Sequence, residues 1–242
     1  MNPYLLLWLE APLQAWGHDS KFGRRDSLDF PTKSGVLGLL CCARGVDGEE
    51  RDWLSDWAGL DMQVEAFVPR NAKGAPLPRL PLLEDFHMVG AGYDLTDPWQ
   101  ALMEPRLTNG SPRKSAGGGV KMTYRYYLQD MAFAVAIETP IDEAEAIADA
   151  LKAPVWDLYL GRKNCVPTEL VFQGLHASAE EALAAGRALA EAKQRALAFT
   201  VKQGEHEGEV LTLNDVPLQF GPDKRYRDRR VTVLQAGSGD GG

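Results

Sequence analysis

The stretch from Thr123 to Pro154 constrains the fold of this 242-residue chain more than any other. It contains two β-rich segments, Thr123–Leu128 and Ala132–Glu138, and the pair Gln129-Asp130 between them is typical of the turn of a β-hairpin. From Glu138 to Pro154, apolar residues recur at helical spacing between two prolines. The stretch therefore predicts a hairpin followed directly by a helix that packs on its sheet.

Three further segments complete the expected order of strands and helices. Tyr4–Glu10 and Met62–Pro69 read as buried strands, and the segment from Pro31 to Gly45 has the apolar stripe of a helix. A last strand is expected near Tyr159. The resulting order, strand, helix, strand, insertion, hairpin, helix, strand, is that of a ferredoxin-like β-α-β-β-α-β unit, which is also the topology of the RNA-recognition motif. We therefore predict an α+β fold of this class.

The rest of the chain elaborates this unit. Residues 87–121 are rich in Gly, Pro, Asn, Ser and basic side chains, so we expect an insertion that projects from the core. An Ala-rich helix from Ser178 to Ala198 and short strands at Ala198–Val201, Val210–Leu213 and Val231–Leu234 follow. The prediction is a single domain over residues 1–242, with a core (1–86 and 122–202), a projecting insertion (87–121), a C-terminal β-rich extension (203–234) and a disordered tail (235–242).

Charge is distributed unevenly along the chain. The net charge is −8 and the pI about 5.1, yet no Asp or Glu occurs between Pro105 and Gln129. Two other basic stretches are "KFGRR" (residues 21–25) and "DKRYRDRR" (residues 223–230). An acidic body with local basic stretches can bind a polyanion on one face and stay soluble on the others.

The composition also argues against several classes of protein. The three cysteines, Cys41, Cys42 and Cys165, have no CxxC spacing, which argues against a zinc site and favours a reducing cytoplasm. The longest apolar run near the start, Tyr4–Leu9, is too short to span a bilayer, so no membrane association is expected. No motif indicates a metal ion or another cofactor.

The segment "DFPTKSGVLGLL" (Asp29–Leu40) raises the possibility of a phosphate site. A phosphate loop needs glycines before its Lys-Ser pair, but Pro31 and Thr32 precede Lys33 here and the glycine follows. Two interpretations stay open: a helix N-terminus with Lys33 that binds one backbone phosphate, or a capped helix with an exposed lysine.

Two more segments could contact nucleic acid. "GSPRKSAGGGVKMTYRYY" (Gly110–Tyr127) combines three glycines with basic residues and three tyrosines that could stack on bases. "YLGRKNCVP" (Tyr159–Pro167) puts Gly161, Arg162 and Lys163 at the end of the expected strand. The alternatives are a flexible charged loop with core tyrosines, and an ordinary exit from a strand.

Catalysis has little support in the sequence. Four histidines are present, none at metal-ligand spacing, and no motif of a nucleophilic enzyme occurs. A metal-free ribonuclease would need only a His, Tyr or Lys at a 2′-hydroxyl, for which His87, Tyr93 and Lys121 are the candidates.

Taken together, the chain resembles the Cas-five-type subunits of the type I-E CRISPR Cascade complex, members of the RAMP superfamily. The segments that carry the resemblance are "LEAPLQAWG" (Leu9–Gly17), "DFPTKSGVLGLL" (Asp29–Leu40), "DFHMVGAG" (Asp85–Gly92), "YRYYLQDMAFAVAIE" (Tyr124–Glu138), "YLGRKNCVP" (Tyr159–Pro167) and, more loosely, "FGPDKRYRDRRV" (Phe220–Val231). The resemblance implies a modified RNA-recognition motif with a projecting thumb. It also implies a non-catalytic role in antiviral defence, in which the subunit caps the 5′ handle of the crRNA and seats the first backbone subunit.

The resemblance also implies partners and contact residues. The partners are the crRNA, the backbone subunit CasC, the large subunit CasA and, through the complex, target DNA. Together with the charge pattern, it indicates these RNA contacts: Arg125, Lys121, Lys114, Arg113, Arg106, Lys33, Arg162, Lys163, Lys21, Arg24 and Arg25. Gln14 and Trp16 belong to a family motif, although Trp16 also suits a core. A metal-independent endoribonuclease that processes precursor RNA and an RNA-independent adaptor are the alternatives.

Overall fold

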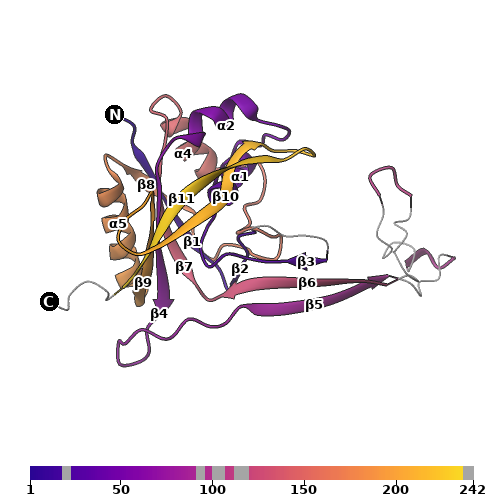
Figure 1. Ribbon diagram of the computed structural model, residues 1–242, viewed down its shortest axis with the longest axis horizontal. Helices are drawn as coiled ribbons and strands as arrows, with labels where there is room; N and C mark the ends of the chain where they lie inside the picture. Colours follow the sequence, from indigo (N-terminus) through magenta and orange to yellow (C-terminus); the bar gives the residue numbers. More distant parts are fainter. Residues whose placement is uncertain (18–22, 91–95, 100–106, 112–119, 237–242) are drawn as a thin grey trace.

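A computed structural model of the chain describes residues 1–17, 23–90, 96–99, 107–111 and 120–236 (Figure 1). In chain order the elements are β1 (Tyr4–Glu10), β2 (Leu13–Gln14), β3 (Arg24–Arg25), α1 (Lys33–Arg44), α2 (Arg51–Ala58), β4 (Met62–Pro69), β5 (Leu83–Gly90), β6 (Val120–Gln129), β7 (Ala132–Glu138), α4 (Ala144–Lys152), β8 (Phe172–His176), α5 (Ala179–Ala192), β9 (Arg195–Gln203), β10 (Glu209–Gln219) and β11 (Arg225–Gln235). The protein is thus α+β, as predicted. No described helix has the length and apolarity needed to cross a membrane.

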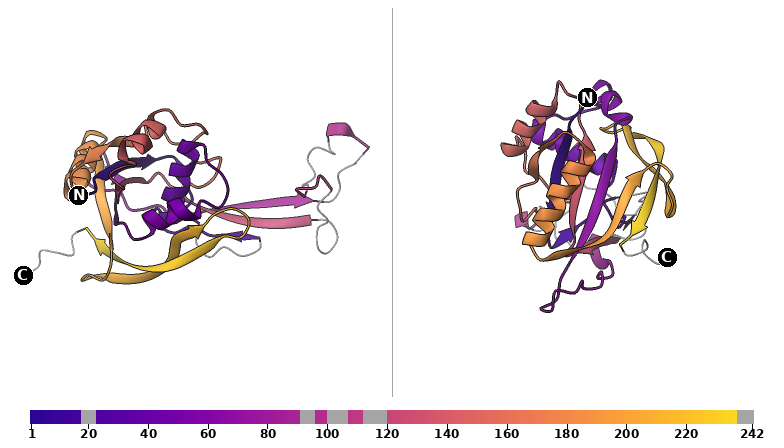
Figure 2. Two further views of the ribbon diagram at one scale, coloured as in Figure 1. Left: turned by 90° about the horizontal axis from the view of Figure 1, so that it is seen from above. Right: turned by 90° about the vertical axis from the view of Figure 1, so that its left-hand side faces the viewer.

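The body is built on one large antiparallel sheet. Its strand order is β10-β11-β9-β4-β7-β1-β8. Helices cover both faces: α1 packs with α4 on one side, and α5 packs against β1, β7 and β9 on the other (Figure 2). The strands β1 and β7 lie between these layers, which explains why both have continuous apolar sequences instead of alternating ones.

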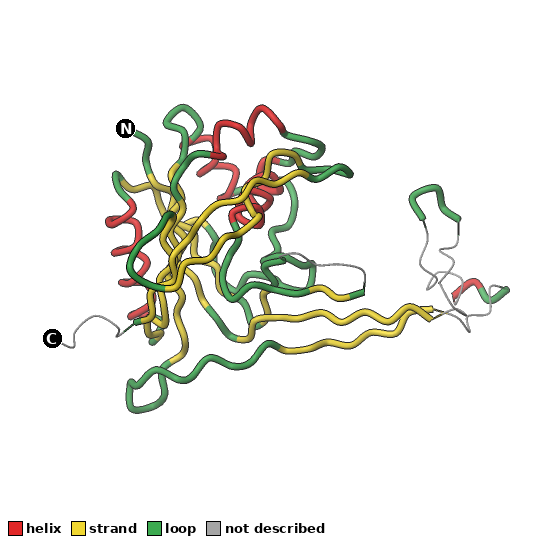
Figure 3. The backbone as a smooth tube through the Cα atoms, viewed as in Figure 1, coloured by secondary structure: helices red, strands yellow, loops and turns green. Residues whose placement is uncertain are grey.

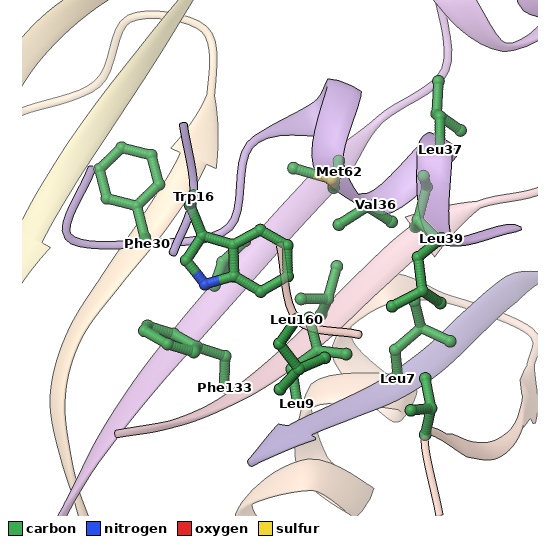
Figure 4. Close-up of a cluster of buried hydrophobic side chains, with 14 of the residues drawn as sticks. Leu7, Leu9, Trp16, Phe30, Val36, Leu37, Leu39, Met62, Phe133 and Leu160 are labelled. Carbon is green, nitrogen blue, oxygen red and sulfur yellow. The ribbon is translucent and has the colours of Figure 1, made fainter. Parts of the chain in front are cut away.

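The side chains of β1 alternate between two apolar clusters. Leu5, Leu7 and Leu9 face α1, whereas Leu6 and Trp8 face α5, and all five are almost completely buried. Figure 4 shows the larger cluster, in which Leu7 and Leu9 meet residues of α1, β4 and β7. A sheet packed on both faces provides a rigid support for the segments that leave it.

A two-stranded arm extends from this body. Strand β5 pairs along its full length with residues 120–127 of β6, and the two strands project well beyond the sheet (Figure 3). At the end near the body, β6 also pairs with β2 and β3, which gives a small second sheet. The expected insertion, residues 87–121, therefore contains regular structure at its two ends, because β5 runs to Gly90 and β6 begins at Val120.

The predicted hairpin between Thr123–Leu128 and Ala132–Glu138 is wrong. The strands β6 and β7 are consecutive but belong to different sheets, since β6 pairs with β2, β3 and β5, and β7 pairs with β1 and β4. Asp130, with φ of 50°, redirects the chain between them, and its N–H donates to the carbonyl of Pro12. A strand as apolar as β7 is buried on both faces and needs a partner on each side within the main sheet.

Other predictions differ in detail. The strand expected near Tyr159 is absent, because that segment is irregular and the next strand, β8, begins at Phe172. Helix α2 was not predicted. The Ala-rich helix is confirmed but ends at Ala192, and the end of its predicted range belongs to β9. The three C-terminal strands are confirmed and are longer than expected. Of the predicted disordered tail, residues 237–242 lie outside the described residues, and Gln235 ends β11.

Candidate nucleic-acid interface

Four of the predicted RNA contacts meet where the arm joins the body. Strand β3 pairs in parallel with β6, which sets Arg24 beside Tyr124 and Arg25 beside Arg125. The approach of the two strands depends on Gly23, since a Cβ at that position would lie 2.6 Å from the carbonyl oxygen of Met122. We call Arg24, Arg25, Arg125 and the nearby Arg162 the arm-base cluster.

Arg24 lies over the ring of Tyr126, with its guanidinium carbon 4.7 Å from the ring centroid. Its Nε also donates to Asp26 at 2.9 Å. The Tyr126 hydroxyl donates to the Glu84 carboxylate at 2.5 Å, and this hydrogen bond raises the pKa of Tyr126. Arg24 is therefore oriented by a ring and a carboxylate, while its side chain stays largely exposed.

Arg162 braces the cluster from the opposite side. Its guanidinium donates to the carbonyls of Tyr126 (3.0 Å) and Arg25 (2.8 Å) and lies 4.5 Å from the centroid of the Tyr127 ring. Arg162 thus ties the irregular segment 155–171 to both β3 and β6. The adjacent Lys163 is exposed.

Arg125 lies on β6 between β3 and β5, opposite Arg25. It is half-buried on β6, opposite Asp85 of β5. The Asp85 carboxylate contacts His87 Nε2 at 2.6 Å. Within the described part of the chain, the Arg125 side chain makes no hydrogen bond or ion pair. Its donors are therefore available to an anion.

The phosphate-site interpretation of Lys33 is wrong. The Lys33 side chain is fully buried, and its ammonium group donates to the carbonyls of Ala58 (3.2 Å) and Leu60 (2.5 Å). The start of α1 is capped by the protein itself: Lys33 N–H donates to Asp215 at 2.8 Å, and Gly35 N–H donates to Thr32 Oγ1 at 3.1 Å. The alternative with an exposed lysine is wrong for the same reason.

Gln14 and Trp16 belong to the core. The Gln14 amide donates to the carbonyls of Leu9 and Met131, and it accepts from the Trp16 indole N–H at 3.2 Å. Both side chains are buried, and the Trp16 ring lies among apolar residues near Leu160 (Figure 4). These residues join the start of the small sheet to the main one.

Several predicted contacts lie outside the described residues, namely Lys21, Arg106, Arg113 and Lys114. The backbone of Lys121 is in β6, opposite Val89. Of the ribonuclease candidates, Tyr93 is also outside the described residues, and His87 is exposed and paired with Asp85. No group of His, Cys, Asp and Glu in the described residues could hold a metal ion.

One face of the arm carries the predicted stacking residue Tyr124 together with Phe86, Met88 and Met122, which the sequence analysis did not single out. Phe86 and Tyr124 are cross-strand partners with ring centroids 5.1 Å apart, and Met88 pairs with Met122 farther along the arm. All four are exposed. Alternation in "LEDFHM" was the available signal, because it places Phe86 and Met88 on one face of β5.

Burial of Lys33 predicts an unusual dependence of stability on pH. Desolvation by burial and the nearby charge of Arg229 lower the pKa of Lys33 to about 8. The Asp215 carboxylate has the opposite effect but offsets only part of this shift. Between pH 8 and 10.5 the unfolded state therefore binds more protons at this residue than the folded state, and this contribution to the unfolding free energy rises with pH by up to about 3 kcal/mol.

Denaturant unfolding at several pH values measures this effect. Other groups also titrate in the range, so the matched comparison is Lys33→Met, which keeps the length of the side chain. The unfolding free energy of the wild type minus that of the variant should increase from pH 8 to pH 10.5. A constant difference would contradict the assigned pKa shift.

Comparisons with known proteins identify relatives of this chain. Residues 4–232 match the family model described as CRISPR-associated protein (Cas_Cas5). The chain is 32% identical over 180 residues to "CRISPR system Cascade subunit CasD" of Escherichia coli (strain K12), covering 72% of this chain and 71% of that protein.

Two solved structures are also similar. One is a chain of a "CRISPR RNA-guided surveillance complex" (TM-score 0.68, 31% identity, 96% of this chain and 89% of the other). The second is titled "Crystal structure of Cas protein" (TM-score 0.56, 27% identity, 96% and 95%). The match to the family model spans nearly the whole chain, including the body, the arm and the C-terminal strands. The chain therefore belongs to the Cas5 family of CRISPR-associated proteins.

Proposed function

We propose that this protein is a non-catalytic subunit of a Cascade complex in the cytoplasm, where it caps the 5′ handle of the crRNA and seats the first backbone subunit. Its similarity to a Cascade subunit and to a chain of an RNA-guided complex supports this role. CasC and CasA are the proposed protein neighbours, and target DNA is reached through the complex.

The arm-base cluster is the observation that carries the proposal. Arg24, Arg25, Arg125 and Arg162 gather around one strand of a protein whose net charge is −8. These four guanidinium groups outnumber the carboxylates of Asp26, Glu84 and Asp85 beside them, and a positive place on an acidic body favours a polyanion. The exposed Phe86 and Tyr124 rings nearby offer surfaces on which splayed RNA bases can stack.

The fold supports a more specific description. The elements β1, α1, β4, β7, α4 and β8 follow one another in the order of a ferredoxin-like unit, and their strands are adjacent in the order β4-β7-β1-β8. We propose that this unit is a modified RNA-recognition motif within a single domain over residues 1–242. The arm of β5 and β6 would be its thumb, and β9, β10 and β11 would extend its sheet.

The absence of catalysis is tested by incubating the purified full-length protein with end-labelled repeat RNA. The reactions contain either chelator or magnesium, and the products are run on a denaturing gel. We expect intact RNA in both, because the proposed role is to hold the RNA and the His87 side chain is exposed to water on the arm, not enclosed in a site. A specific cut that persists in chelator would identify a processing ribonuclease, and loss of that cut in His87→Ala would assign the base.

A further inference from the structure

The hairpin of β10 and β11 carries a second group of cations, apart from the arm-base cluster. The basic stretch of residues 223–230 runs along β11 from the turn toward the body. In Figure 1 and in the left view of Figure 2, the turn of this hairpin points to the same side of the body as the arm. The cations near the turn and those near the body have different surroundings.

The two arginines nearer the body are neutralised within the protein. Arg229 donates through Nε and Nη2 to the Asp215 carboxylate, at 2.7 and 2.9 Å, and its side chain is 7% exposed. Arg230 pairs with Glu205. Both therefore have a structural role, and the Asp215 carboxylate that holds Arg229 also caps α1.

The cations nearer the turn have no carboxylate partner. Lys224 and Arg225 are exposed, and within the described residues neither makes a hydrogen bond or ion pair through its side chain. Arg227 is also exposed, and its guanidinium donates to the Ala58 carbonyl at 3.1 Å, which fixes its position without neutralising it.

The facing strand adds no negative charge to this end of the hairpin. Opposite Arg225 and Arg227, the β10 segment 216–219 is uncharged. The three cations of the turn region outnumber Asp223, and Glu49, which lies beside Gly221, is already paired with Arg51, so the region stays positive on a protein with a net charge of −8. Uncompensated cations repel one another, and an anionic ligand relieves that repulsion.

We propose that Lys224, Arg225 and Arg227 form a second nucleic-acid contact, which binds the phosphodiester backbone of a segment other than the one held at the arm-base cluster. This inference rests on the proposed function, since it extends the polyanion surface along the same side of the molecule. Cations spaced along a strand suit a ligand with repeated charges and no base readout. The segment is either crRNA beyond the handle or duplex DNA.

The test measures the salt dependence of binding with the full-length chain. The variant is K224Q/R225Q, which spares Arg227 and its contact with Ala58. Fluorescence anisotropy follows the binding of three probes: handle RNA alone, full-length crRNA and duplex DNA. The control is K73Q/K152Q, which removes the same charge from the exposed turn after β4 and from the end of α4.

The expected result is a smaller log–log salt slope for one of the longer probes. Loss of two phosphate contacts lowers the slope by about 1.4 for single-stranded RNA or about 1.8 for duplex DNA. A change with crRNA alone assigns the contact to crRNA, and a change with DNA alone assigns it to the target. Handle RNA should bind the variant and the wild type equally.

If K224Q/R225Q and the control have equal slopes with every probe, the second contact is wrong. This failure differs from failure of the proposed function. In the latter case handle RNA itself would show no salt-dependent binding to the wild-type protein. A slope change with handle RNA alone would also overturn the inference, because it would make the hairpin part of the handle site.

Discussion

Gly161→Ala is expected to lower the free energy of unfolding by at least about 3 kcal/mol. Gly161 has φ of 97°, and a Cβ there would lie 1.7 Å from the carbonyl oxygen of Ala15. The residues on either side hold the segment in place, because the Leu160 carbonyl accepts from Ala15 N–H and Arg162 braces the arm. The variant must therefore shift backbone that joins two parts of the core.

Urea unfolding measures this loss, with Gly38→Ala as the control. Gly38 lies inside α1, and a Cβ at that position would meet nothing within 4 Å. Alanine favours a helix over glycine, so the control should be more stable than wild type by about 0.5–1 kcal/mol. If Gly161→Ala behaves like the control, the close packing of the segment 155–171 against Ala15 is wrong.

Arg125→Ala is expected to weaken the binding of handle RNA by about 10- to 100-fold. A hydrogen bond between charged groups contributes roughly 1.5–3 kcal/mol, and the Arg125 donors have no partner among the described residues that would replace the RNA. Loss of one phosphate contact should also lower the log–log salt slope by about 0.7. Stability should change little, because the side chain makes no hydrogen bond or ion pair with the described residues.

Filter binding or anisotropy at several salt concentrations gives both quantities. Lys73→Ala is the control, since Lys73 is exposed in the turn after β4, away from the arm. Its affinity should stay within about twofold of wild type. Equal affinities for Arg125→Ala and the control would remove Arg125 from the handle site and leave the arm-base cluster without its central member.

The elements of this fold could be predicted from the sequence better than their pairing. Periodicity located β1, α1, β4, α4 and α5, because each buries an apolar stripe or run. Periodicity could not show that β6 leaves the main sheet, since a strand, a short turn and a strand is also the local pattern of a hairpin. The sequence of β6 alternates polar and apolar residues, whereas that of β7 is continuously apolar. This contrast was the local sign that the two strands belong to different sheets.

The candidate site was predicted in part for a similar reason. Local charge identified Arg24, Arg25 and Arg125, and the pairing of β3 with β6 brings them together. It also suggested Lys33, whose ammonium group is buried against the carbonyls of Ala58 and Leu60, 25 and 27 positions away in the chain. Helix α2 was missed because its apolar stripe is short, consisting of Trp53, Leu54 and Trp57, and polar residues interrupt it in the sequence.

The measurement that most directly tests the central claim is photocrosslinking of the wild-type protein to repeat RNA that carries 4-thiouridine in the 5′ handle. Mass spectrometry then identifies the modified peptides. The proposed role predicts crosslinks at β3 (Arg24–Arg25) and at Tyr124, Arg125 and Tyr126 of β6, where the arm joins the body. Crosslinks confined to α5 or β8, with none at β3 or β6, would contradict it.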